Sequence, residues 1–235
     1  MPFPVCAMLH TRHTASATTA RPQLPVWKVL FDRQTALLHR RAAPAVALGV
    51  AALGLSRDAP PDLTRLERQL RRETGWVLLP EAAPLDCEDY FAALGARHLP
   101  VVTGLRAAVD FERTTPDLFA DVFGRLPLLL EPTYAEFLAE MGRLLGQASS
   151  ARRPALLRFY HATADFGMLA ALAGAGAKPA PQVFGARLLT SARHLHAALA
   201  APAPLAPLHD WAQLRAALAA PMPGERGATP LALAA

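Results

Sequence analysis

Residues 116–128 read Pro116-Asp117-Leu118-Phe119-Ala120-Asp121-Val122-Phe123-Gly124-Arg125-Leu126-Pro127-Leu128. This is the most informative segment of the chain for predicting its fold. Its charged side chains are two carboxylates, Asp117 and Asp121, and one guanidinium, Arg125. Ala120 has no donor atom, and Arg125 cannot lose its proton in a protein. Neither Ala120 nor Arg125 can therefore give a lone pair to a metal ion.

The order of residues in 116–128 resembles the iron-binding segment of the pterin-dependent aromatic amino acid hydroxylases, in particular the bacterial phenylalanine 4-hydroxylases. That family has the pattern Pro-Asp-x-x-His-Asp-x-Phe-Gly-His-x-Pro-Leu. Here the scaffold residues are present, but Ala120 and Arg125 stand at the two histidine positions. Non-haem iron(II) oxygenases hold the metal with two imidazoles and one carboxylate. The resemblance therefore implies the housing of an iron site that is degenerate, because both imidazoles are missing.

The resemblance runs from about Val26 to about Leu218 and does not depend on one motif. Further matching segments follow in order at near-family spacing: 27–38 (WKVLFDRQTALL), 74–76 (TGW), 90–94 (YFAAL), 105–106 (LR), 158–167 (RFYHATADFG) and 184–191 (FGARLLTS). Together they imply an α+β, mainly helical fold, a single aromatic amino acid hydroxylase-like catalytic domain with small β pieces. The family uses non-haem iron and tetrahydrobiopterin, but the changed ligand positions lead us to expect no metal and to assign no cofactor.

Carried over from the family, the third iron ligand falls on Asp165, where a shorter carboxylate replaces glutamate. If the fold is kept, Arg125 and Asp165 both project toward the former iron position. A buried carboxylate that loses its cation keeps an uncompensated charge, which is costly. An arginine is a suitable fixed-charge substitute with bidentate geometry. We therefore hypothesise an Arg125–Asp165 ion pair in place of the iron; the alternative is a surface Arg125 and a solvated Asp165.

Four residues are candidates for binding a substrate. Arg106 corresponds to the family's anchor for the amino acid carboxylate, although it could equally be an ordinary surface arginine. Thr190 and Ser191 keep hydroxyls where the family has two serines near the substrate, and His161 replaces a tryptophan that packs against the substrate ring. Arg187 replaces a glycine in the same segment, which indicates a narrower or more polar pocket.

Asp165, His161 and Asp121 are the candidates for acid–base catalysis, since histidine titrates near neutral pH. Asp121 could also be a helix N-terminal charge. His161 and Asp165 are spaced i, i+4 and share a helix face. With His194, and with Asp121 as a further donor, they could form a relocated metal site.

The composition fits one globular domain. The chain has 235 residues, of which 52% are hydrophobic and 18% charged, so it is not disordered as a whole. The formal charge of +5 comes from scattered arginines without a long basic run, and we expect no nucleic-acid partner. Cys6 and Cys87 are too few for a disulfide framework or a zinc site, and a cytoplasmic location is the default.

We expect a domain over residues 25–220 between disordered tails at 1–24 and 221–235. The apolar run 44–55 is shorter than the roughly 20 residues of a membrane span and indicates a buried helix, hence no membrane partner. Capping or first-turn residues predict helix starts at Asp62, Asp86, Pro132, Pro154 and Asp210. Short strand-like runs occur at 76–79, 101–102 and 187–189.

Three functions from different classes remain open. The first is a family member that has lost iron-dependent hydroxylation and still binds a small molecule, such as an aromatic amino acid or a pterin. The second is an enzyme with altered chemistry in the same cleft, metal-free or with a relocated metal. The third is an active aromatic amino acid hydroxylase with unusual iron ligation. The sequence does not indicate the oligomeric state.

Overall fold

The computed structural model describes residues 23–107, 111–112, 115–170, 181–200, 208 and 210–219. Its longer helices are α1 (Gln23–Leu38), α2 (Pro44–Ala52), α3 (Leu63–Thr74), α4 (Cys87–Gly95), α5 (Leu118–Gly124), α6 (Pro132–Gln147), α7 (Arg153–Tyr160), α9 (Ala192–Ala200) and α10 (Ala212–Ala219). Shorter helical elements are the 3₁₀ helix η1 (Leu126–Leu130), the π-helix η2 (His161–Asp165) and α8 (Ala186–Thr190).

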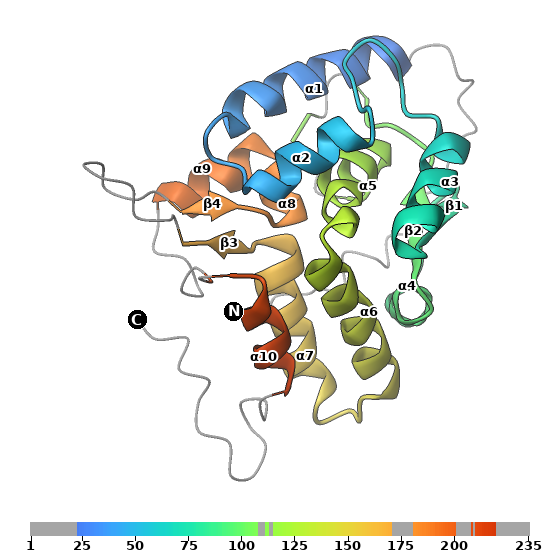
Figure 1. The fold of residues 1–235 in the computed structure, drawn as a ribbon, viewed down its shortest axis with the longest axis vertical. Helices are drawn as coiled ribbons and strands as arrows, with labels where there is room; N and C mark the ends of the chain where they lie inside the picture. Colours follow the sequence, from blue (N-terminus) through green and yellow to red (C-terminus); the bar gives the residue numbers. More distant parts are fainter. Residues whose placement is uncertain are drawn as a thin grey trace.

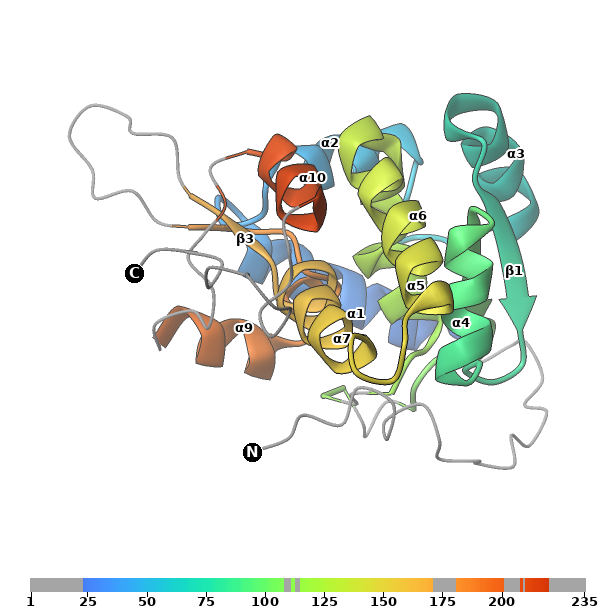
Figure 2. The same cartoon turned by 90° about the horizontal axis from the view of Figure 1, so that it is seen from below.

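Two small sheets lie at opposite sides of the helical body (Figure 1 and Figure 2). Strands β1 (Val77–Glu81) and β2 (His98–Val102) pair in parallel, and α4 connects them. Strands β3 (Met168–Leu169) and β4 (Gln182–Val183) pair in antiparallel fashion. The mainly helical α+β architecture predicted for the chain is confirmed.

The predicted helix starts are confirmed, and the capping chemistry explains them. The Asp62 side chain accepts a hydrogen bond from the Arg65 amide, and Asp86 does the same for α4. Such a cap satisfies one of the unpaired amides of a helix N-terminus. Proline stands in the first turn of α6 and α7, where it costs no helical hydrogen bond.

Three expectations about elements need correction. Residues 187–189 lie in α8, not in a strand, because a short apolar run fits a strand or a buried helix equally well. Helix α1 begins at Gln23, inside the segment 1–24 expected as a tail. Helix α2 is only partly buried, since Leu48 is 70% exposed. Residues 1–22 and 221–235 of the expected tails lie outside the described residues, as does residue 220 of the expected domain.

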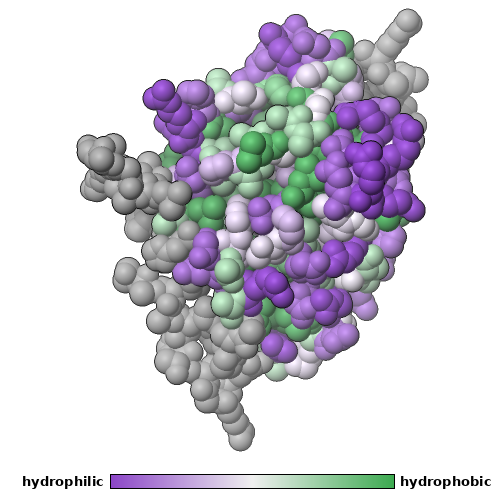
Figure 3. Space-filling view, in the orientation of Figure 1, coloured by the Kyte–Doolittle hydropathy of each residue, from purple (hydrophilic) through white to green (hydrophobic). Residues whose placement is uncertain are grey.

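The core fills the space between the helices with large apolar side chains. Trp27, Phe119 and Phe137 are fully buried in it, with Phe91 and Phe184. The exposed apolar surface in view in Figure 3 lies partly over α1 and α2, which carry exposed residues such as Val29 and Leu48. Within the described ranges, no helix is long and apolar enough to cross a membrane.

Helix α4, which carries one wall of the site, is held against α6 by a close backbone approach. A methyl group at Gly142 would lie 2.2 Å from the Gly95 amide nitrogen and 2.7 Å from the Phe91 carbonyl oxygen. Backbone atoms cannot yield as a flexible side chain can. The crossing of α4 and α6 therefore requires glycine at position 142.

We expect Gly142→Ala to lower the free energy of unfolding by about 2–3 kcal/mol, because overpacking is destabilising. In thermal unfolding this corresponds to a loss of roughly 4–12 °C for a domain of this size. Gly146→Ala on the same helix is the matched control. Its added methyl meets nothing within 4 Å, so helix propensity should make it neutral or stabilising. A Gly142→Ala protein as stable as its parent would contradict the close crossing.

Candidate functional site

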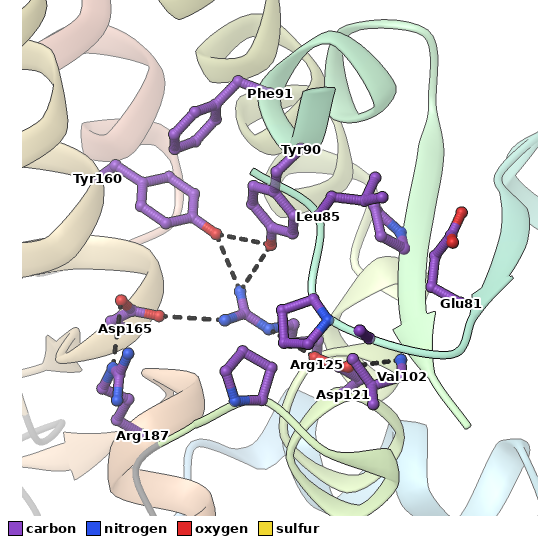
Figure 4. A pocket seen from close by; sticks show the side chains of 14 residues that line it. Glu81, Leu85, Tyr90, Phe91, Val102, Asp121, Arg125, Tyr160, Asp165 and Arg187 are labelled. Carbon is purple, nitrogen blue, oxygen red and sulfur yellow. Dashed lines mark hydrogen bonds and ion pairs between the residues drawn. The ribbon is translucent and has the colours of Figure 1, made fainter. Parts of the chain in front are cut away.

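The candidate site is a cleft where five helical elements meet strands β1 and β2 (Figure 4). Helix α5 carries Asp121 and is followed directly by Arg125; α4 contributes Tyr90. The end of α7 and the π-helix η2 contribute Tyr160 and Asp165. Helix α8 adds Arg187, and the cleft has a volume of about 610 Å³ with its open mouth included.

Arg125 occupies the centre of this cluster, as Figure 4 shows. One terminal nitrogen donates to the Tyr90 hydroxyl at 3.0 Å and to the Tyr160 hydroxyl at 2.9 Å. The other donates to Asp165 Oδ1 at 3.3 Å. The side chain is only 14% exposed, so the predicted Arg125–Asp165 pair is confirmed and the surface alternative is wrong.

Tyr90 and Tyr160 are partners that the sequence did not suggest for Arg125. Their hydroxyls lie 3.0 Å apart and share the same guanidinium nitrogen. Burial raises the pKa of both phenols, so both stay neutral at physiological pH and accept from the arginine. The two terminal nitrogens of the guanidinium thus contact one carboxylate and two neutral hydroxyls.

Asp165 has three cationic or hydrogen-bonding neighbours. His161 Nδ1 lies 3.0 Å and Arg187 Nε 3.4 Å from its Oδ2, while Arg125 contacts Oδ1. Burial opposes ionisation, but the His161 hydrogen bond and the two guanidinium groups hold the pKa of Asp165 well below its usual range. Asp165 is therefore an ionised, fully engaged carboxylate, and the predicted His161–Asp165 contact is confirmed.

Asp121 is buried on the opposite side of Arg125. Its Oδ2 accepts from the Val102 amide at 2.9 Å, and its Oδ1 lies 3.4 Å from Arg125 Nε. Burial raises the pKa of Asp121 to about 6, although Arg125 and the Val102 amide act in the other direction. Asp121 thus exchanges a proton near neutral pH, which suits the acid–base role predicted for it.

The raised pKa of Asp121 makes a signed prediction about stability. Its ordinary pKa is 3.8, so between about pH 4 and pH 6 the folded state binds more protons than the unfolded state. Stability contributed by Asp121 is therefore present below pH 4 and lost as pH rises through 6. Asp121→Asn removes this loss. The difference in unfolding free energy between the variant and the parent should therefore shift in favour of the variant by roughly 2.5 kcal/mol from pH 4 to pH 7.

Urea unfolding of parent and Asp121→Asn at pH 4, 5, 6 and 7 measures that difference. Comparing the two proteins at each pH cancels groups that both retain, including His194, whose pKa burial lowers. A difference that stays constant across this range would show that Asp121 does not titrate there.

Arg106 is buried, which excludes its interpretation as a surface arginine. Its Nε and one terminal nitrogen each donate to Asp117 at 2.7 Å, and the other terminal nitrogen donates to the Phe111 carbonyl at 2.9 Å. Asp117 also caps α5 through the Ala120 amide. Binding of an amino acid carboxylate by Arg106 stays a prediction. The carboxylate would have to bind the guanidinium N–H groups that do not donate to Asp117 or Phe111.

The hydroxyls of Thr190 and Ser191 lie beside Arg106 in a second, smaller hollow, and both already donate within the protein. Thr190 donates to the Ala186 carbonyl at 2.7 Å. Ser191 donates to Glu112 at 2.9 Å and accepts from the His194 amide. Their contact with a substrate stays a prediction. The two hydroxyls would have to accept hydrogen bonds from the substrate, or first give up the bonds that they now donate.

The relocated metal site is not assembled. His161 contacts Asp165, but the His194 ring packs against Phe166, with centroids 5.4 Å apart. Within the described ranges, no three His, Cys, Asp or Glu side chains are grouped so that they could hold a metal ion. The i, i+4 spacing correctly paired two residues but could not place the third.

Comparison with known proteins agrees with the fold. The chain is 31% identical over 192 residues to the phenylalanine-4-hydroxylase of Caulobacter vibrioides, covering 80% of this chain and 62% of that protein. It is 31% identical over 190 residues to a tryptophan 5-hydroxylase of Xenopus laevis, covering 79% of this chain and 38% of that protein. The chain thus spans about two thirds or less of the length of these relatives.

Solved structures give the same result. The phenylalanine hydroxylase of Legionella pneumophila superposes with a TM-score of 0.71 at 26% identity, covering 80% of this chain and 76% of that one. That of Chromobacterium violaceum, with bound iron(III) and 7,8-dihydrobiopterin, superposes with a TM-score of 0.69 at 29% identity, covering 75% and 63%.

Fold and site define a mainly helical α+β domain with a buried network of ion pairs at the base of an open cleft. The chain belongs to the biopterin-dependent aromatic amino acid hydroxylase family, whose model matches residues 15–215. The family predicted from residues 116–128 and the accompanying motifs is thus confirmed.

Proposed function

We propose that this chain is a family member that has lost iron-dependent hydroxylation and binds a small molecule in the cleft. The observation that carries the proposal is the position of Arg125, whose guanidinium contacts Asp165 and two tyrosine hydroxyls. A permanent cation at the carboxylate expected to bind iron repels a metal ion rather than coordinating it.

The residues present do not fit the family's iron. A facial iron(II) site takes two imidazoles and one carboxylate. At the corresponding positions stand Ala120, Arg125 and Asp165, which supply one carboxylate and no imidazole. That carboxylate already has Arg125, Arg187 and His161 as partners. No chemical step through iron is therefore proposed.

The lining of the cleft offers groups that could contact a flat, amino-bearing ring such as a pterin. Tyr90 and Phe91 give it an aromatic wall, and the Glu81 and Asp121 carboxylates can accept hydrogen bonds. An aromatic amino acid is the other ligand that the family relationship suggests. The chain's localisation in the cytoplasm and the lack of a nucleic-acid partner remain predictions.

A second candidate is altered, metal-free chemistry in the same cleft. The favouring observation is the pair of differently tuned carboxylates, since Asp165 is held ionised while the pKa of Asp121 is about 6. Such pairs are typical of sites that divide acid and base roles. His161, hydrogen-bonded to Asp165, would be a further proton carrier. An active hydroxylase with unusual iron ligation is the third candidate, and the Arg125 contacts count against it.

The test combines metal analysis with a ligand screen on one preparation. We expect no stoichiometric iron, and a thermal shift with a reduced pterin or with phenylalanine, tyrosine or tryptophan. A ligand at 100 times its dissociation constant stabilises by about 2.7 kcal/mol. Glu81→Gln in the cleft should weaken a pterin shift, whereas Glu67→Gln on α3 should not. One equivalent of iron with hydroxylation of phenylalanine would refute the proposal.

A further inference from the structure

A second hollow lies beside the cleft and has a different electrostatic character. Arg125, Arg187 and Pro116 line both, so the two arginines form a partition between them. Beyond the partition, Arg106, Thr190, Ser191 and His194 line the second hollow. We refer to it as the arginine hollow.

The arginine hollow presents cations, and the cleft presents the matching carboxylates. Three guanidinium groups line the hollow, whereas none of its described lining residues is Asp or Glu. Asp121 and Asp165 line the cleft, on the other side of the partition. Asp117 pairs with Arg106 from outside the lining. A ligand in the hollow therefore meets three guanidinium groups, each of which is paired with a carboxylate that does not line the hollow.

The wall of the hollow also contains a polar atom that lacks a protein partner. His194 Nδ1 is buried and has no hydrogen-bond partner among the described residues. Burying such an atom unpaired is costly, so a ligand that hydrogen-bonds to it gains affinity. Arg187 and Arg193 contribute to the lowered pKa of His194, after burial itself, which fits a positive surrounding.

From this geometry we propose that the arginine hollow binds a compact, doubly charged oxyanion of the phosphate type, free or as a phosphomonoester. Guanidinium groups match phosphate oxygens with paired N–H donors, and arginine is the preferred residue for such recognition. The proposal rests on the proposed function, because it requires Arg125 to stay at the partition rather than yield to a metal.

The same lining disfavours a zwitterionic amino acid in the hollow. An α-ammonium group needs a carboxylate or several acceptors, and here it would face three guanidinium groups. The Thr190 and Ser191 hydroxyls already donate to Ala186 and Glu112, so they add little to carboxylate recognition. The hollow thus favours an anion without a neighbouring positive charge.

Calorimetry and thermal shift at constant ionic strength test this inference on the full chain. The probes are inorganic phosphate, phenyl phosphate and L-phenylalanine, with chloride as the reference. Phosphate should bind and raise the unfolding temperature. A preference for phenyl phosphate over inorganic phosphate would identify a phosphomonoester as the ligand. A preference for inorganic phosphate would identify free phosphate.

Arg187→Gln should weaken phosphate binding about tenfold or more, because a charge-assisted hydrogen bond is lost. Arg193→Gln is the matched control: it removes the same charge from an exposed position outside the hollow and should change binding little. If Arg187→Gln does not fold, His194→Phe, which removes the unpaired nitrogen, takes its place.

Two results would overturn the inference. One is the absence of phosphate binding, whether or not phenylalanine binds. The other is equal weakening of phosphate binding by Arg187→Gln and Arg193→Gln. Iron analysis of the same sample separates the two claims. Without iron and without phosphate binding, the proposed loss of iron-dependent hydroxylation stands and this inference fails; one equivalent of iron refutes the proposed function.

Discussion

Arg125→Leu is expected to lower the free energy of unfolding by about 3 kcal/mol, because it removes a cation that contacts two buried carboxylates, Asp165 and Asp121. Asp165 keeps Arg187 and His161, which holds the loss near the lower end of the range for broken buried pairs. The Tyr90 and Tyr160 hydroxyls lose their donor at the same time. Thermal unfolding should shift down by roughly 6–12 °C for a domain of this size.

Two further variants distinguish the loss of the ion pair from general damage to packing. Adding Asp165→Asn to Arg125→Leu removes a carboxylate that has lost one of its cations and should recover part of the stability. Arg143→Leu breaks a pair with Glu140 that is 53% and 35% exposed, and should change stability by less than about 1 kcal/mol. Equal effects of Arg125→Leu and Arg143→Leu would show that the buried pair has no special role.

Restoring imidazoles should restore metal binding. The triple variant Ala120→His, Arg125→His, Asp165→Glu supplies the two-imidazole, one-carboxylate set that iron(II) oxygenases use, on a scaffold that superposes on iron-containing relatives. We expect the parent to bind no stoichiometric metal and the triple variant to bind about one equivalent. Removing Arg125 also removes the cation that repels the metal.

Metal titration with cobalt(II) as a spectroscopic substitute, together with elemental analysis after iron(II) loading, measures this gain. The matched control is Ala120→His alone, which adds one imidazole but keeps Arg125. It should stay metal-free. A folded triple variant that binds no metal would mean that more than the ligand set separates this cleft from an iron site.

The sequence predicts features that depend on neighbouring residues better than features that depend on contacts between residues far apart in the chain. Caps at Asp62 and Asp86 are local, and they were located correctly. The run 187–189 has only three residues, two of them apolar, and so short a run has no usable period to separate a strand from a helix. Only packing against α5, through contacts such as that of Gly124 with Ala186, determines that it is helical.

In the candidate site, too, some contacts follow from the sequence and others depend on the fold. The Arg125–Asp165 pair was predictable because a buried carboxylate that lost its cation needs another. Tyr90 and Tyr160 stand in motifs that were recognised, yet they lie 70 residues apart, and nothing local joins their hydroxyls to one guanidinium. The Arg106–Asp117 pair and the Glu112 contact with Ser191 likewise join distant residues through the fold.

The most direct test of the proposed loss of iron chemistry is the iron content of the purified chain after anaerobic incubation with iron(II) and removal of free metal. The proposed replacement of the metal by Arg125 predicts far less than one equivalent, unchanged by Asp165→Ala. One equivalent of iron that is lost in Asp165→Ala, with turnover of phenylalanine by a reduced pterin, would contradict it.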